Sequence, residues 1–130
     1  MQAEKILQKM IHREIGSRVD VRAFINDVGG AYHGTLVERN GERILRNPKP
    51  FRYGMKKGVS DLIGYQRIII TPDMIGREIA RFLAIEVKVE KRKPSPEQVN
   101  FIQAVERFGG ISGIARSVEE AVQIIERNGL

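Results

Sequence analysis

The chain has 130 residues, and its 42% hydrophobic and 29% charged content is typical of a globular protein rather than a disordered one. It has no cysteine, which excludes disulfides, thiolate metal ligands and a cysteine nucleophile. The formal charge of +6 favours an acidic partner such as nucleic acid. No apolar run reaches the roughly 20 residues that span a bilayer, and the first residues lack a secretory signal pattern. We therefore expect a single domain over residues 1–130, cytoplasmic and without membrane contact.

The first half of the chain predicts a helix, a strand and a basic region. Residues 2–16 place apolar side chains at helical spacing, and residues 19–25 alternate as a strand. Asn40-Gly41 suits a tight reversal, which predicts a small hairpin. The remainder of residues 31–57 carries glycine, proline and positive charge, and we expect a surface loop there.

The second half predicts alternating strands and helices. The helix that follows Ser95 has clear start signals: Ser95 suits the N-cap, Pro96 the first helical position, and Gln98 a capping box. Ser117, with Glu120 three residues later, caps the last helix in the same way. Strands are expected at residues 61–70, 82–89 and 111–115, and the connection at 72–81 has room for a short helix. One α/β domain is the simplest account.

Glu86 and Lys88 share a face of the strongest predicted strand. Alternate side chains of a strand point the same way, so these two follow Phe82 and Ala84, while the opposite face is wholly apolar and can pack on helices. A carboxylate and an ammonium group are costly to desolvate unless they are paired or bound to a metal. The residues alone also allow an ordinary ion pair on a solvated edge strand.

Asp61 is a second acidic residue in an unusual position. It stands where a glycine-bearing loop enters an apolar run, although aspartate is a poor strand residue. A turn or cap aspartate is one explanation, and a metal ligand is the other. If the two strands are neighbours, Asp61 and Glu86 can converge on one divalent ion, for which carboxylate oxygens suit Mg²⁺ or Mn²⁺.

Several segments come in an order and spacing that resemble a known nuclease family. They are Lys57–Gly64, Phe82–Lys88, Ser95–Gln98 and Gly109-Gly110, together with Phe24–Gly29 as a first-strand segment. This pattern resembles the PD-(D/E)xK nuclease superfamily and, more specifically, its virus-type replication-repair nuclease branch, the VRR-NUC domain. The resemblance covers nearly the whole chain, and Ser60 replaces proline as this branch commonly does. It implies a restriction-endonuclease-like core, a mixed central β-sheet flanked by helices.

The resemblance also implies roles for individual residues. Asp61 and Glu86 would ligate the ion with help from the Val87 carbonyl, and Lys88 would hold or polarise the attacking water. Glu4 on the first helix would bind a second metal or outer-shell waters.

Two of these assignments have alternatives. Glu14 lies on the same helix as Glu4, but it stands too close to Gly16 and is interpreted as a surface residue. Gln98 borders the site in the family, where it would orient Lys88 or a phosphate. A purely structural role in the capping box is an equal interpretation.

The implied activity is Mg²⁺- or Mn²⁺-dependent endonucleolytic hydrolysis of DNA, without an organic cofactor. Stand-alone members of the branch resemble four-way-junction (Holliday-junction) resolvases that act as homodimers, and the interface cannot be located from the sequence. A flap or nick nuclease, a non-catalytic nucleic-acid-binding module and a phage structural protein are the alternatives. Basic side chains beside the acidic residues would hold flanking phosphates without reading sequence; they are Arg52, Lys56, Lys57, Lys91, Arg92 and Lys93.

Other chemistry-bearing residues form no coherent motif. His12 and His33 lie in different predicted elements and are expected on the surface. Tyr32, Phe51 and Tyr53 could stack on bases from the basic region, but ordinary packing is the favoured interpretation.

Overall fold

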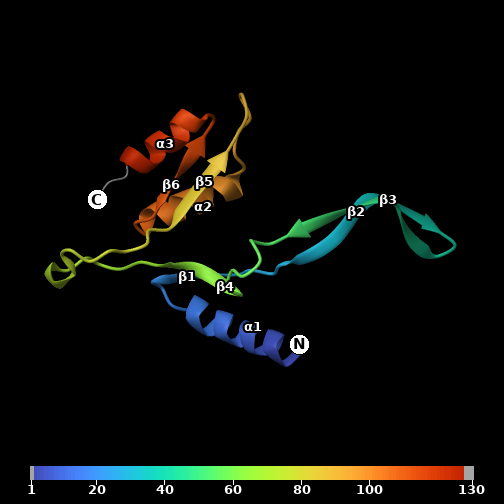
Figure 1. Cartoon of the computed structure of the whole chain (residues 1–130), viewed down its shortest axis with the longest axis horizontal. Coiled ribbons are helices and arrows are strands. Elements are labelled where there is room, and N and C mark those ends of the chain that lie inside the picture. Colours follow the sequence, from blue (N-terminus) through green and yellow to red (C-terminus); the bar gives the residue numbers. More distant parts are fainter. Residues whose placement is uncertain (1, 128–130) are drawn as a thin grey trace. The chain divides into compact units, whose positions relative to one another are not determined.

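The computed structural model describes residues 2–127 and divides into two compact units, each of which is taken by itself. The first unit contains the described part of residues 1–17 together with 23–63, and the second contains 18–22 together with the described part of 64–130. The expected mixed α/β character is confirmed (Figure 1). The elements in chain order are α1 (Gln2–Gly16), β1 (Val21–Ile25), β2 (Gly29–Arg39), β3 (Glu42–Tyr53), β4 (Leu62–Gln66), the 3-10 helix η1 (Pro72–Met74), β5 (Leu83–Val87), α2 (Pro96–Arg107), β6 (Ile111–Ala115) and α3 (Val118–Arg127).

Within the described residues the strands form three two-stranded sheets, β1 with β4, β2 with β3, and β5 with β6. The single central sheet and the single-domain organisation therefore stay predictions. None of the described helices combines the length and the apolar character that crossing a membrane requires.

Helix α1 confirms the predicted helix, but its apolar face is not buried. Ile6, Leu7 and Met10 are all more than half exposed. A polar contact instead joins the helix to β1. His12 Nε2 lies 2.9 Å from the carbonyl oxygen of Ala23, a residue of that strand. His12 is half-buried, so this expected surface histidine is only partly exposed.

The β2–β3 hairpin is much longer than the sequence predicted. Its turn is the expected one: Asn40 and Gly41 have φ angles of 52° and 76°, the left-handed pair of a tight hairpin turn. The strands continue to Gly29 and Tyr53, so the predicted surface loop was largely wrong. Both are edge strands of a two-stranded sheet, the position in which residues such as Pro48 and Pro50 are tolerated.

In the second unit, two helices cover opposite faces of the parallel β5–β6 pair (Figure 1). Ser112 Oγ donates a 2.8 Å hydrogen bond to the Ile102 carbonyl of α2, whereas the next residue, Gly113, lies against Ile124 of α3. Successive strand residues point to opposite faces, so α2 and α3 are on different sides. The buried hydrophobic side chains of the described residues are Val105, Ala115 and Ile124.

The coverage of β5 differs from the expectation. The Glu86 face lies under α2, and the opposite, apolar face is left open because α3 packs on β6. Val87 is consequently 71% exposed, and Leu83 is half-exposed. The expectation that the apolar face packs on helices was wrong for these two side chains.

Strand β4 is shorter than the predicted strand 61–70. The Arg67 N–H donates to the Asp20 carbonyl at 2.8 Å, beyond which Ile68–Ile70 have no paired strand in the described structure. The side chain of Asp20 also contacts the end of β4, because its carboxylate accepts a hydrogen bond from Gln66. The Arg18 guanidinium, and then the Gln66 amide, donate hydrogen bonds that lower the pKa of the Asp20 carboxyl to about 2. The carboxylate is therefore ionised near neutral pH.

Candidate active site

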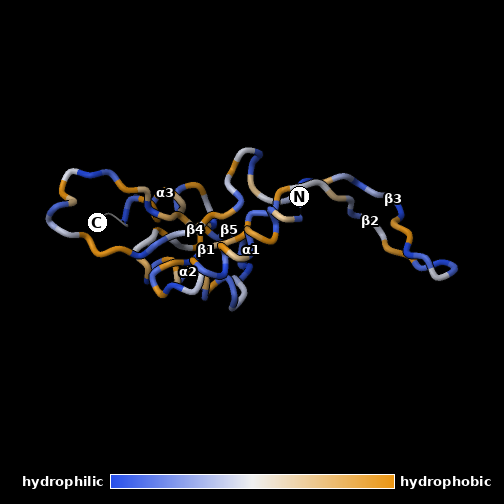
Figure 2. The backbone as a smooth tube through the Cα atoms, turned by 90° about the horizontal axis from the view of Figure 1, so that it is seen from below, coloured by the Kyte–Doolittle hydropathy of each residue, from blue (hydrophilic) through white to orange (hydrophobic). Residues whose placement is uncertain are grey.

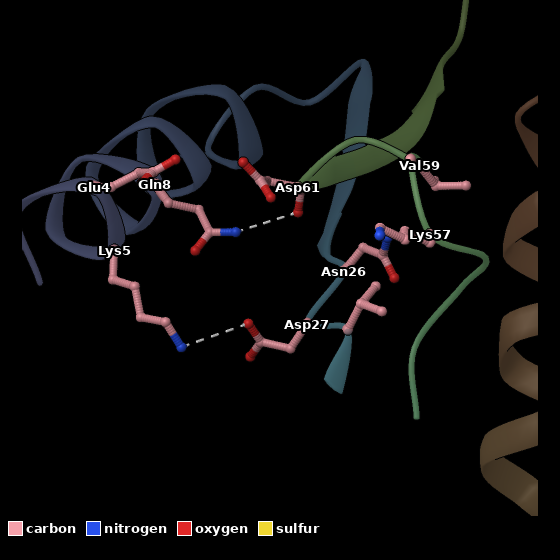
Figure 3. A pocket seen from close by; sticks show the side chains of 10 residues that line it. Glu4, Lys5, Gln8, Asn26, Asp27, Lys57, Val59 and Asp61 are labelled. Carbon is pink, nitrogen blue, oxygen red and sulfur yellow. Dashed lines mark hydrogen bonds and ion pairs between the residues drawn. The ribbon is translucent and has the colours of Figure 1, made fainter. Parts of the chain in front are cut away.

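The first unit holds a pocket of ≈310 Å³ that brings two of the predicted acidic residues together. Glu4 of α1 lines this pocket, and so does Asp61, the residue directly before β4. Figure 3 shows the side chains of Glu4, Gln8 and Asp61 gathered on the same side of this pocket. Gln8 lies one turn after Glu4, and its Nε2 donates to the Asp61 carbonyl at 3.3 Å, which ties the helix to the acidic residue.

Glu4 rather than Glu14 is the helix acid at this pocket. Glu14 does not line it, and its described contact is local, since its carbonyl accepts a 2.7 Å bond from Ser17 Oγ. Lys57 also lines the pocket, whereas Arg52 lies on the β2–β3 hairpin. Sequence reasoning did not find Gln8, although its spacing of four residues from Glu4 places both on one helix face.

Asn26 is a second residue that the sequence reasoning did not single out. It is 9% exposed, and its side chain makes two bonds to the loop that precedes β4. Nδ2 donates to the Ser60 carbonyl at 3.1 Å, and Oδ1 accepts from the Met55 N–H at 3.0 Å. The Asn26 N–H donates to the Asp61 carbonyl at 2.8 Å. Asn26 therefore clamps the loop on which Asp61 stands.

Replacing Asn26 with alanine is expected to destabilise the first unit by about 2–3 kcal/mol, because it leaves the Met55 N–H and the Ser60 carbonyl without their partners. Urea unfolding followed by circular dichroism measures this loss. Asn100→Ala is the matched control, since Asn100 is exposed on α2. A loss as small as the control's would contradict the clamp.

The second unit holds the Glu86 and Lys88 pair. Lys88 Nζ lies 2.9 Å from Glu86 Oε1, and Gln98 Nε2 donates to the same oxygen at 2.8 Å. The side chains of Lys88 and Glu86 are 18% and 27% exposed, so the pair is largely removed from solvent. Within the described residues both contacts use Oε1, which leaves Oε2 available to an ion.

Gln98 has two structural roles at once. Its Oε1 accepts from the Ser95 N–H at 2.9 Å, and Ser95 Oγ accepts from the Gln98 N–H at 3.2 Å, which completes the predicted capping box. Its Nε2 contacts Glu86 rather than Lys88. A capping role and a place beside the Glu86–Lys88 pair are thus compatible for Gln98. The capping box fixes the Gln98 side chain at the start of α2, where its amide contacts the Glu86 carboxylate.

A basic pocket of ≈420 Å³ adjoins this pair. It is lined by Lys88, Arg92, Lys93, Ser95 and Gln98, and three of these side chains carry positive charge. A concave surface with this charge suits an oxyanion such as a phosphate group.

The acidic residues at and beside these pockets have the type of oxygen ligand that divalent metals bind. Each unit offers carboxylate oxygens, Glu4 and Asp61 in the first and Glu86 in the second, and such ligands suit Mg²⁺ and Mn²⁺, which retain several waters. Among residues 2–127, no group of three acidic or histidine side chains forms a complete metal site.

Comparison with known proteins adds no relative. No family model matches the chain, and neither the curated proteins nor the solved structures give a significant match.

Proposed function

We propose that this protein is a divalent-metal-dependent endonuclease that hydrolyses DNA phosphodiester bonds. The observation that carries the proposal is the Glu86–Lys88 pair, held at 2.9 Å and buttressed by Gln98. A structural ion pair needs no open oxyanion pocket beside it, whereas a hydrolytic carboxylate and lysine do. The basic pocket lined by Lys88 and Arg92 therefore supports a hydrolytic role for Glu86 and Lys88 over a purely structural ion pair.

The proposal assigns metal binding to the carboxylates of Asp61 and Glu86, with the Val87 carbonyl as a further ligand. Bound there, Mg²⁺ or Mn²⁺ would lower the pKa of a water and offset charge on the non-bridging oxygens. Lys88 would position that water and stabilise the developing negative charge. Glu4 would bind a second ion or outer-shell waters, which its place in the Asp61 pocket supports.

The basic side chains near each acidic group would hold the DNA backbone. Arg92 and Lys93 line the pocket beside Lys88, and Lys57 lines the pocket of Asp61. Lys56, Lys91 and Arg52 complete the proposed set. Because phosphate contacts carry no sequence information, the substrate would be selected by its structure. A four-way junction is the proposed substrate, and a nicked or flapped duplex is the alternative.

A homodimer belongs to the same proposal, since paired incisions in a junction need two sites. The segment between β4 and β5 supports this part of the proposal, because its exposed apolar side chains could pack against a second copy of the chain. Ile69 and Ile75 are each 84% exposed, and Ile68, Ile70 and Ile79 are also exposed. Several exposed apolar side chains in one segment are typical of an interaction surface in a folded protein. A restriction-endonuclease-like core with one central sheet would complete the fold.

A cleavage assay on end-labelled substrates tests the proposal. The protein is incubated with a four-way junction, a flapped duplex, a nicked duplex and a linear duplex, each in Mg²⁺, Mn²⁺ or EDTA. We expect metal-dependent, paired and symmetric nicks in the junction, and no cleavage in EDTA. Light scattering on the same sample measures the oligomeric state.

The other outcomes separate the alternatives. Cleavage that persists in EDTA would rule out the metal site. Metal-dependent cutting of the flap alone, by a monomer, would replace the resolvase with a flap nuclease. Binding without cleavage of any substrate would identify a non-catalytic nucleic-acid-binding module.

A further inference from the structure

One face of the β2–β3 hairpin combines aromatic rings with positive charge. Directly paired residues of antiparallel strands share a face, and the register pairs Gly29 with Tyr53, Ala31 with Phe51, and His33 with Lys49. These positions alternate along each strand, so all six belong to the same face. We call the side chains of His33, Arg46, Lys49, Phe51 and Tyr53 the aromatic-basic face.

Arg46 joins this face through a register shift. Thr35 follows His33 by two residues on β2 and pairs with Arg46, while Asn47 and Pro48 lie between Arg46 and Lys49 on β3. The extra residue keeps both cationic side chains on one side instead of on opposite sides. Asn47 has a φ of 50°, the left-handed conformation that such an irregularity uses.

The rings contact one another but are not buried. The Phe51 centroid lies 5.6 Å from that of His33 and 6.4 Å from that of Tyr53. Phe51 and Tyr53 are nevertheless 42% and 46% exposed, so their packing on one another leaves much of each ring at the surface. The partners across the sheet are small, Gly29 and Ala31, and a Cβ at Gly29 would meet the Tyr53 ring.

The charge on the aromatic-basic face is uncompensated. In the described part of the chain, neither Arg46 nor Lys49 pairs with a carboxylate, whereas Arg43, which pairs across the sheet with Glu38, has its charge partner 3.5 Å away. Figure 2 shows hydrophilic and hydrophobic residues interspersed along the hairpin, with a hydrophilic tip. Exposed rings beside free cationic groups are the combination that binds single-stranded nucleic acid, because bases stack on the rings while phosphates contact the charges.

We propose that the aromatic-basic face binds unpaired nucleotides of the DNA substrate. Phe51 and Tyr53 stack on bases, and Lys49 and Arg46 contact the adjoining phosphates. Bases inside a duplex are already stacked, so this surface discriminates in favour of DNA with open or splayed strands. The inference rests on the proposed function for DNA as the partner, and it supplies a physical basis for preferring a branched substrate.

The opposite face of the hairpin provides an internal control. Tyr32 is 66% exposed and pairs with Pro50, one residue out of phase with the aromatic-basic face. Leu36 and Leu45 continue that opposite face toward the turn, and Arg52, which pairs with Gly30, adds one cationic side chain at its other end. The Tyr32 face thus carries one ring, whereas the aromatic-basic face carries the contacting rings of His33, Phe51 and Tyr53 beside two cationic side chains.

Fluorescence anisotropy in EDTA tests binding without any cleavage. The probes are a labelled single strand of mixed sequence and a blunt duplex of the same sequence. Phe51→Ala and Tyr53→Ala should each weaken binding of the single strand by at least about fivefold, while duplex affinity changes less than about twofold. Tyr32→Ala, which removes a ring from the same hairpin, should leave single-strand affinity unchanged.

Salt dependence tests the charged half of the face. Arg46→Ala and Lys49→Ala should each reduce the slope of log affinity against log salt by about 0.7 on the single strand. The ring variants should leave that slope unchanged, because they remove no phosphate contact.

The contrary outcomes are specific. Equal losses for Tyr32→Ala and Phe51→Ala, or no loss for the two ring variants, would overturn the proposal. A ring variant that alters the oligomeric state by light scattering and leaves DNA affinity intact would assign the face to a second copy and overturn it as well. If the wild-type protein cleaves no substrate while the ring variants still bind the single strand more weakly, the nuclease proposal would fail and this proposal would be supported.

Discussion

Lys88→Met is expected to lower the rate of junction cleavage by about 10²–10³-fold, the loss typical of removing one group that stabilises developing charge. The affinity for uncleaved DNA should change much less, since several other cationic groups contact the backbone. Methionine keeps the length of the side chain and removes only its charge. Glu86 keeps its 2.8 Å bond from Gln98, so the carboxylate stays in place.

Single-turnover cleavage at saturating protein measures this effect on the chemical step. Lys9→Met is the matched control, because Lys9 is an exposed lysine on α1 outside the proposed machinery. Thermal unfolding of both variants checks that the fold is retained. A Lys88→Met enzyme that cleaves within about threefold of the wild type would remove Lys88 from the catalytic residues.

The features that the sequence predicted well are set by chemistry within a few residues. Ser95 and Gln98 form the capping box that their spacing indicates, and Asn40-Gly41 adopts the expected left-handed turn. Ser117 Oγ likewise accepts from the Glu120 N–H at 3.1 Å at the start of α3. Each of these contacts is closed by neighbours in the chain, so its residues determine it without reference to the rest of the fold.

The features that were missed depend on partners far along the chain. The length of the β2–β3 hairpin is set by cross-strand pairing between residues such as Gly29 and Tyr53. The apolar pattern of Ile68–Ile70 is that of a strand, but a strand also needs a neighbour, and none pairs with it among the described residues. Which face of β5 is covered depends on where α2 and α3 lie, and periodicity alone carries no such information.

The candidate site shows the same division. Glu86 and Lys88 could be placed on one face by alternation alone, and the 2.9 Å contact agrees with that placement. Gln8 and Asn26 could not be assigned, because their roles arise from bonds to Asp61 and Ser60, 53 and 34 residues away in the chain. A glutamine on a helix and an asparagine after a strand are ordinary residues until the distant backbone is known.

The proposal assigns metal binding to both Asp61 and Glu86, which makes manganese-induced stabilisation its most direct physical test. At about 100 times its dissociation constant, a ligand stabilises the folded state by roughly 2.7 kcal/mol, or about 10 °C for a chain of this size. We expect Asp61→Asn and Glu86→Gln each to abolish that rise in Tm, measured by scanning calorimetry. Each substitution keeps the side-chain shape and removes only the charged ligand.

Glu4→Gln and Glu14→Gln complete the series and test the choice between the two helix acids. Glu4→Gln should weaken the stabilisation, because Glu4 lines the Asp61 pocket, and Glu14→Gln should retain it in full. Stabilisation that is lost in Asp61→Asn but kept in Glu86→Gln would show an ion held by the first unit alone. The Glu86–Lys88 pair would then be a structural ion pair, and the chemistry would have to be sought around Glu4 and Asp61.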